Sequence, residues 1–65
     1  MKKFIKLKSF WKEINGWIVN INNILFVEDK DIYRDITIRI NGETTNKTIR
    51  VENSIDEIYN ALNKK

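Results

Sequence analysis

The stretch Asp35-Ile36-Thr37-Ile38-Arg39-Ile40-Asn41-Gly42, followed by Thr45 to Glu52, decides the fold. Polar and apolar residues alternate strictly from Asp35 to Ile40, which predicts a half-buried strand. Asn-Gly is a turn signal, so the chain is expected to return as a second strand over Thr45 to Glu52. If Ile40 faces Glu43 across a tight turn, the aliphatic residues of both strands share one face: Ile36, Ile38, Ile49 and Val51.

Three shorter strands are expected before this pair. The stretch from Phe4 to Ser9 alternates between apolar residues and lysines, which predicts an edge strand protected by charge. Asn15-Gly16 predicts a hairpin turn into a strand over Trp17 to Val19. The run from Ile24 to Val27 predicts a strand that is apolar on both faces, and the acidic stretch from Glu28 to Tyr33 predicts a loop.

A helix with a well-marked start is expected at the end of the chain. Ser54-Ile55-Asp56-Glu57 is a capping box, in which Ser54 accepts from the first turn and Glu57 reaches back. Lys64 and Lys65 suit the negative end of the helix dipole. The apolar stripe that covers a sheet face is Ile55, Ile58, Tyr59 and Leu62. The expected fold class is therefore α+β: a single domain over residues 1–65, with a small five-stranded, mostly antiparallel β-sheet and one C-terminal α-helix.

Composition removes most catalytic chemistry. The 65 residues include 12 Lys and Arg against 9 Asp and Glu, which gives a net charge of +3, and there is no Cys and no His. Thiolate nucleophiles, Cys/His zinc sites and histidine bases are therefore excluded. A chain this short rarely forms a deep, dry cleft. We therefore expect no enzymatic activity and no cofactor.

The acidic run Glu28-Asp29-Lys30-Asp31, with Asp35, is the only stretch that invites a metal-site interpretation. It lacks the glycine and the closing glutamate of a calcium-binding EF-hand loop. A solvated loop is therefore expected, and no metal site.

Localisation and source follow from the ends of the chain and from composition. Lysines interrupt any signal-peptide core near Met1, and no apolar run approaches the ~20 residues that cross a bilayer. We therefore expect a cytoplasmic protein with no membrane partner. Twelve Ile, nine Lys and nine Asn are residues of AT-rich codons, which favours an AT-rich bacterium or one of its phages.

Short strand and turn motifs together resemble the small FlbD family, also called SwrD, which is associated with bacterial flagella. The resemblance covers about Phe4 to Ile58. The matching motifs are Ile5-Lys6-Leu7, Ile18-Val19-Asn20 with Ile24, Ile36-Thr37-Ile38 before Asn41-Gly42, Val51-Glu52-Asn53-Ser54, and Glu57-Ile58. The resemblance implies a very small fold without catalytic residues, and no functional residue is carried over from it.

Surplus aromatic residues are the first candidate functional feature. One helix and one sheet face can bury the aliphatic residues, which leaves five rings over: Phe4, Phe10, Trp11, Trp17 and Phe26. Large exposed apolar patches mark partner or ligand sites. We therefore predict an intermolecular surface, with a second small core under a curled sheet as the alternative.

The basic N-terminal stretch is the second candidate functional feature. Lys2, Lys3, Lys6, Lys8 and Lys12 precede the first acidic residue and alternate with rings. Lysines could bind phosphates while the rings stack on bases of a single-stranded nucleic acid. The small net charge and the scarcity of arginine instead favour a solvated edge strand.

The third candidate functional feature is a pair of arginines, Arg39 and Arg50. The predicted hairpin register places both on the outer face and Tyr33 opposite Arg50, where a cation–π contact is possible. Across a symmetric interface, paired arginines and rings could hold a small anionic ligand such as a nucleotide. Ion pairing with Glu43 or Glu52 is the alternative.

These features favour a small, phage- or mobile-element-encoded binding protein that acts as a homo-oligomer. It would inhibit a host protein, as a host-defence inhibitor, or sequester a nucleotide-like signalling ligand. A flagellar accessory protein and a single-stranded nucleic-acid binder are the alternatives. The candidate binding residues are Phe4, Lys6, Trp11, Trp17, Phe26, Tyr33, Arg39 and Arg50.

Overall fold

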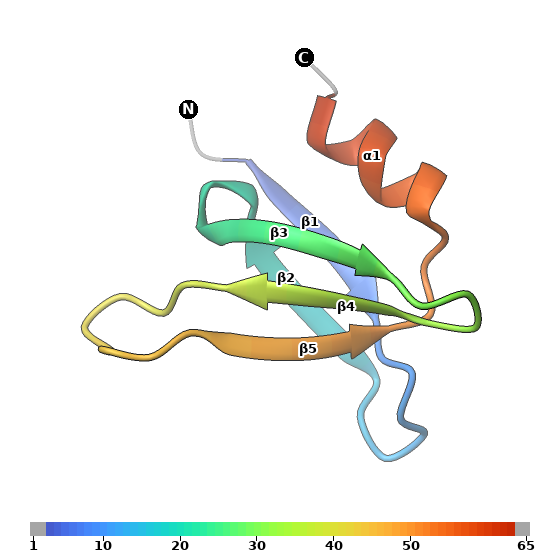
Figure 1. Ribbon diagram of the computed structural model, residues 1–65, viewed down its shortest axis with the longest axis horizontal. Coiled ribbons are helices and arrows are strands. Elements are labelled where there is room, and N and C mark those ends of the chain that lie inside the picture. The colour runs from blue at the N-terminus through green and yellow to red at the C-terminus, as the bar shows by residue number, and fades with distance from the viewer. Residues whose placement is uncertain (1–2, 64–65) are drawn as a thin grey trace.

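The computed structural model describes residues 3–63, and within them it confirms the α+β class, with antiparallel strands and a C-terminal helix (Figure 1). Lys2, Lys64 and Lys65, which the sequence assigns to a basic stretch and a helix end, lie outside the described residues. The elements are β1 (Phe4–Lys8), β2 (Gly16–Asn20), the 3-10 turn η1 (Ile21–Asn23), β3 (Ile24–Asp29), β4 (Arg34–Ile38), β5 (Lys47–Val51) and α1 (Ile55–Asn63).

The strands form two sheets rather than the single five-stranded sheet expected. Sheet A consists of β1 and β2, and sheet B has the order β3-β4-β5, with all neighbours antiparallel. The sheets join at a corner, where Ser9 forms a bridge with Val51 just beyond the end of β1. Phe10 N–H donates to the Arg50 carbonyl and Glu52 N–H to the Lys8 carbonyl, both at 3.0 Å. The chain that begins in sheet A therefore continues along β5 of sheet B.

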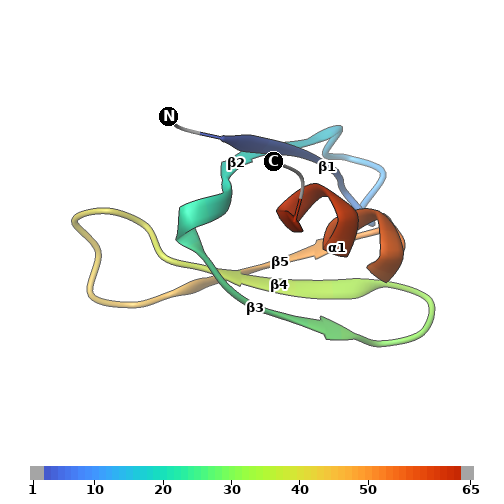
Figure 2. The ribbon, with the colours of Figure 1, turned by 90° about the horizontal axis from the view of Figure 1, so that it is seen from above.

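The core lies between the two sheets, and α1 fills the space between them (Figure 2). Alternate residues of β1, β2 and β5 point into it, as the two-residue period of a strand requires. The buried aliphatic residues are Ile5, Leu7, Val19, Ile36, Ile49, Val51 and Ile58. Each sheet therefore has an inner face on this core and an outer face toward solvent.

The β4–β5 pairing confirms the predicted faces but corrects the predicted register. The turn forms as expected, since Glu43 N–H donates to the Ile40 carbonyl at 3.0 Å. The ladder, however, begins with Ile38 opposite Lys47 and is shifted by two residues, so residues 39–46 form a longer loop. A shift of two residues leaves every side chain on its original face. Ile36 and Ile49 therefore stay on the buried face, and the observed register pairs them directly.

Strand β3 differs from its sequence prediction in position and in length. It runs to Asp29, so the acidic connection shortens to residues 30–33. β3 pairs only with β4 and is an edge strand, although its apolar residues are typical of a strand covered on both sides. The pairing is irregular between Ile24 and Phe26, and Leu25 and Phe26 are both exposed.

The capping box at the start of α1 is confirmed. Ser54 Oγ accepts from the Glu57 N–H at 3.1 Å, and Glu57 Oε1 accepts from the Ser54 N–H at 3.4 Å. The predicted apolar stripe is wrong in part, because Tyr59 is 66% and Ile55 36% exposed. The side that packs on the core consists of Ile58, Ala61 and Leu62.

The hairpin of sheet A forms, but its connection is longer than a two-residue turn. Residues 9–15 make the connection, and Gly16 is the first residue of β2, opposite Lys8. Gly16 has φ +154°, and a Cβ there would lie 2.2 Å from the Leu7 carbonyl oxygen. Glycine is therefore required by the close approach of the two strands rather than by a tight turn.

Candidate functional site

Arg50 is the centre of a polar and aromatic cluster on the outer face of sheet B. It lies on β5 directly opposite Asp35 of β4. Its Nε donates to Asp35 Oδ1 at 3.1 Å, and its Nη2 lies 3.5 Å from Asp35 Oδ2. This hydrogen bond raises the pKa of Arg50 above its usual value. Arg50 is therefore a fixed, charge-paired cation and not a free one.

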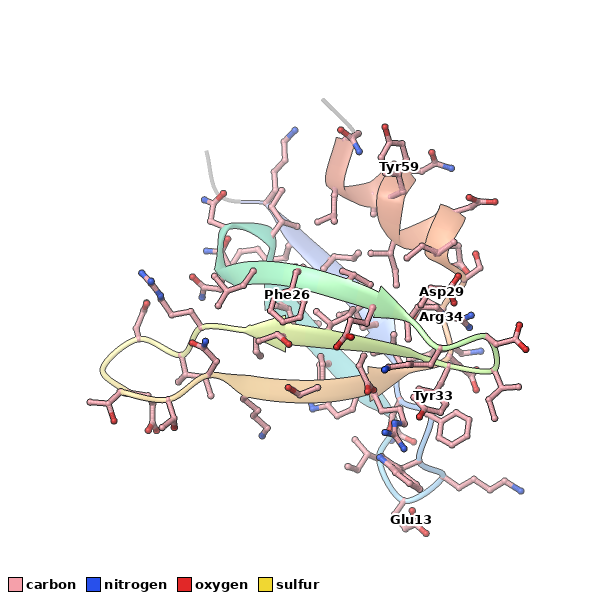
Figure 3. The ribbon with its side chains drawn as sticks, viewed as in Figure 1. Glu13, Phe26, Asp29, Tyr33, Arg34 and Tyr59 are labelled. Atoms are coloured by element: carbon pink, nitrogen blue, oxygen red, sulfur yellow. The ribbon has the colours of Figure 1, made fainter. Side chains whose placement is uncertain are left out.

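Two aromatic rings flank the guanidinium of Arg50. Its Cζ lies 3.8 Å from the ring centre of Tyr33 and 5.6 Å from that of Trp11, both within cation–π range. Phe10 links these rings, with its centre 5.2 Å from Tyr33 and 5.4 Å from Trp11. Tyr33 lies beside the β1–β2 connection, which extends past the β5 edge of sheet B (Figure 3). The corner bridge at Ser9 explains this contact, because it carries the following residues alongside β5.

Beyond Arg50 the outer face continues with threonines and an exposed ring. Thr37 and Thr48 are cross-strand partners whose hydroxyl oxygens are 3.4 Å apart. An open hollow of about 310 Å³ is lined by Trp11, Asp35, Thr48 and Arg50. Phe26 lies opposite Thr37 and is 53% exposed on the same face (Figure 3). The arrangement offers stacking surfaces, hydroxyls and a neutral ion pair, but no activated nucleophile.

The structure brings together three of the predicted site residues, namely Trp11, Tyr33 and Arg50. Phe26 shares their sheet face at the neighbouring edge strand. The predicted cation–π contact of Tyr33 with Arg50 is confirmed, although Tyr33 is not the residue opposite Arg50 in the ladder. The ion-pair partner is Asp35, and the expected partners Glu43 and Glu52 do not fill this role.

The other predicted residues lie elsewhere. Phe4 and Lys6 are exposed on the outer face of sheet A. Trp17 pairs with Leu7 in sheet A and packs against the core. Arg39 is exposed beyond the end of β4, and its backbone N–H donates to the Asn23 carbonyl at 2.8 Å. These residues therefore do not form one site with Arg50.

Sequence reasoning missed Asp35 as a member of the site and treated Phe10 only as a surplus ring. The predicted register hid Asp35, because it placed Tyr33 opposite Arg50. A register shifted by two residues keeps the same buried faces and was equally compatible with the hydrophobic pattern. Opposite charges directly across a strand pair favour the register that is found.

Residues 3–63 contain neither a cluster of metal-binding side chains nor a membrane-spanning helix. No group of three or more Asp and Glu residues in this part of the chain lies close enough to hold a metal ion. The helix described there is not long and apolar enough to cross a membrane.

Comparison with protein-family models, with curated proteins and with solved structures finds no match to this chain. The resemblance to the FlbD family therefore stays a prediction.

Proposed function

We propose that this chain is a non-enzymatic binding protein that docks onto protein surfaces through the outer face of sheet B. This binding face consists of Trp11, Phe26, Tyr33, Asp35, Thr48 and Arg50, with Thr37 buried beside them. The observation that carries the proposal is the Arg50 guanidinium held between Trp11 and Tyr33. Tryptophan, tyrosine and arginine dominate the energetic hot spots of protein interfaces, and fixing them beforehand lowers the entropy cost of binding.

The pairing of Arg50 favours a protein partner over a small anion. Asp35 accepts from Nε and Nη2 of Arg50 and neutralises its charge, so the remaining N–H groups would meet a nucleotide phosphate without the attraction of a free cation. A protein surface can instead cover the neutral pair together with the rings around it. Sequestration of a nucleotide-like ligand, as the sequence suggested, would therefore lack an unpaired cation at Arg50.

A second copy of the chain is the first partner that we propose. The chain has only 65 residues and no cysteine or histidine, so it cannot use disulfides or histidine metal sites to stabilise a small core. A symmetric contact through the binding face brings no unpaired charge of Arg50 against its own copy, because Asp35 neutralises it. The assembled oligomer would then bind and block a target protein.

Native mass spectrometry and sedimentation equilibrium on protein purified directly from cells test this proposal. We expect a multimer, which Trp11→Ala and Phe26→Ser convert to monomer. Tyr59→Ser is the matched control, because Tyr59 is similarly exposed but lies on α1, away from the binding face. A small extra mass on the multimer would instead support the sequestration of a ligand.

Photo-crosslinking in the source cells tests the protein target separately. A photoreactive residue at position 26 should capture the second copy or a target, whereas one at position 59 should not. A wild-type chain that is monomeric and gives no crosslink from position 26 contradicts the proposal. A multimer that survives both Trp11→Ala and Phe26→Ser shows that another face makes the contact.

A further inference from the structure

The outer face of sheet A carries a second, unrelated surface. Residues Phe4, Lys6 and Lys8 of β1 alternate with buried ones and point to solvent. Lys6 lies opposite Ile18 of β2, which is 71% exposed, and Phe4 is 59% exposed. We name Phe4, Lys6, Lys8 and Ile18 the lysine face. It places two large apolar side chains among cations on one side of a two-stranded sheet.

An open hollow lies along β1 and β2 beside the lysine face. It has a volume of about 670 Å³ and is lined by Lys6, Leu7, Lys8, Asn15, Gly16, Trp17 and Ile18. Leu7 is 1% exposed and Gly16 has no side chain, so these two residues contribute backbone to the hollow. Gly16 lies opposite Lys8 at the end of the strand pair, where the two backbones approach closely.

The charge of the lysine face is of one sign. Neither β1 nor β2 contains an acidic residue. Lys8 is 3.6 Å from Glu52, but the side chains of that pair are 75% and 52% exposed, so solvent screens it strongly. Lys6 makes no ion pair with any residue between 3 and 63. The occupant of this face must therefore carry negative charge and accept apolar side chains.

These properties argue against a second copy and against a nucleic acid. A symmetric contact would bring Lys6 and Lys8 against the same lysines of the other chain, where like charges repel. A single-stranded nucleic acid needs rings on which to stack its bases. Phe4 is the only ring on this face, and its most exposed apolar residue is the aliphatic Ile18.

An acidic protein is also a poorer match than a lipid surface. Lysine is depleted in protein interfaces, where arginine and aromatic residues are enriched. Flexible lysines whose stems lie along apolar side chains are instead typical of contacts with anionic bilayers. Such a surface is fluid and does not require fixed cation geometry. From this combination we infer that the lysine face binds the surface of an anionic phospholipid bilayer, with Phe4 and Ile18 at the level of the headgroups.

This inference reverses the expectation that the chain has no membrane partner. That expectation rested on the lack of a spanning segment, and a surface contact needs none. It is independent of the protein-binding face, because the two faces lie on different sheets and share no residue.

Vesicle co-sedimentation tests the inference directly. The wild-type chain should bind phosphatidylcholine vesicles that contain phosphatidylglycerol, should ignore pure phosphatidylcholine vesicles, and should dissociate at high salt. The pair Lys6→Gln with Lys8→Gln should weaken binding at least about tenfold, as two cations contribute to it. The pair Phe4→Ser with Ile18→Ser should weaken it by a similar factor.

Matched controls keep folding separate from binding. Lys47→Gln removes an exposed lysine from β5, and Tyr59→Ser removes an exposed ring from α1. Both should bind anionic vesicles like the wild type. Circular dichroism on every variant shows that the fold is retained, and a charge-only variant such as Lys6→Gln leaves the core untouched.

Tryptophan quenching by brominated lipids identifies the face that meets the bilayer. Trp17 belongs to sheet A, where it lines the hollow and packs its ring toward the core, whereas Trp11 lies beside Arg50 on the other sheet. The remaining Trp17 of Trp11→Phe should therefore be quenched more strongly than the remaining Trp11 of Trp17→Phe. Equal binding to both vesicle types, or full binding by the double lysine variant, overturns the inference. Binding to polyglutamate or an oligonucleotide without binding to vesicles overturns it as well.

Discussion

The outer faces of the two sheets differ in how they hold their cations. On sheet B, Arg50 is fixed by Asp35 and two rings, and its side chain is 32% exposed. On sheet A, Lys8 has 75% of its side chain exposed and one distant partner. A fixed and neutralised cation can be recognised by the shape of a partner, whereas a mobile lysine responds mainly to an electric field. The comparison explains why we assign a protein to one face and a lipid surface to the other.

The same contrast extends to how each sheet is stabilised. Sheet B has a central strand paired on both sides, but sheet A is a two-stranded hairpin, which is marginal in isolation. Sheet A therefore depends on the corner bridge at Ser9, on the close approach at Gly16 and on the shared core. The substitutions with the largest expected effects are those that remove these supports.

Gly16→Ala should have the largest effect, because it acts on the backbone of sheet A. The new Cβ would meet the Leu7 carbonyl oxygen at 2.2 Å, and φ at this position is +154°. Steric overlap and backbone strain together should lower the free energy of unfolding by about 4 kcal/mol. Urea unfolding, monitored by tryptophan fluorescence, measures this change in the free energy of unfolding.

Gly42→Ala is the matched control for this substitution. Gly42 has φ +85° with open space around its Cβ position, so only the backbone preference is lost, at about 1 kcal/mol. If Gly16→Ala and Gly42→Ala cost the same free energy of unfolding, the two strands of sheet A are farther apart than the 2.2 Å between a Gly16 Cβ and the Leu7 carbonyl oxygen implies.

Ile58→Ala should have the second-largest effect, because Ile58 anchors α1 in the core between the two sheets. Ile58 is 1% exposed between the two sheets, and its truncation should cost about 3 kcal/mol. The neighbouring Tyr59→Ala should change the free energy of unfolding by less than about 0.5 kcal/mol, because Tyr59 is 66% exposed. The same urea experiment compares the two variants, and comparable costs at both positions would support the apolar stripe predicted from the sequence, which contains both residues.

Local signals in the sequence predicted the elements well. The alternation around Ile36 and Ile49 sets a strand pair with one buried face, and the Ser54–Glu57 capping box starts the helix where it is found. Both depend on residues that are close in sequence or on a simple period. The class of the fold follows from such signals.

Contacts between distant segments could not be predicted in the same way. No local pattern predicts that Ser9 pairs with Val51, yet this bridge joins the two sheets at their corner and carries Trp11 to Arg50. The β4–β5 register was also ambiguous, because hydrophobic pattern cannot distinguish shifts by two residues. The candidate site depends on both features, so Trp11, Tyr33 and Arg50 were predicted as site residues, whereas Asp35 and the contact of Trp11 with Arg50 were not.

Asp35→Asn should have a moderate effect that tests how firmly Arg50 is held. Asparagine keeps the shape and one acceptor but removes the charge from a pair whose carboxylate side chain is 14% exposed. Replacing a charge-assisted hydrogen bond by a neutral one should cost about 1 kcal/mol in the free energy of unfolding. The cost should change little with salt, since the pair is partly shielded from solvent. A cost near zero would mean that Arg50 is as free as the lysines of sheet A.

Glu52→Gln is the corresponding change beside the lysine face and should have the smallest effect. The Glu52 carboxylate lies 3.6 Å from Lys8, and both side chains are more than half exposed. Exposed pairs of this kind contribute less than about 0.5 kcal/mol, because solvent screens them and two long side chains lose freedom. The backbone N–H of Glu52 still donates to the Lys8 carbonyl, so the corner is unchanged. Both variants are measured by urea unfolding in the same buffer. The difference between their costs in free energy of unfolding reports how much more firmly Arg50 is held than Lys8. If both substitutions cost the same, the lysines of sheet A are as ordered as Arg50, and the reason for assigning different partners to the two faces is lost.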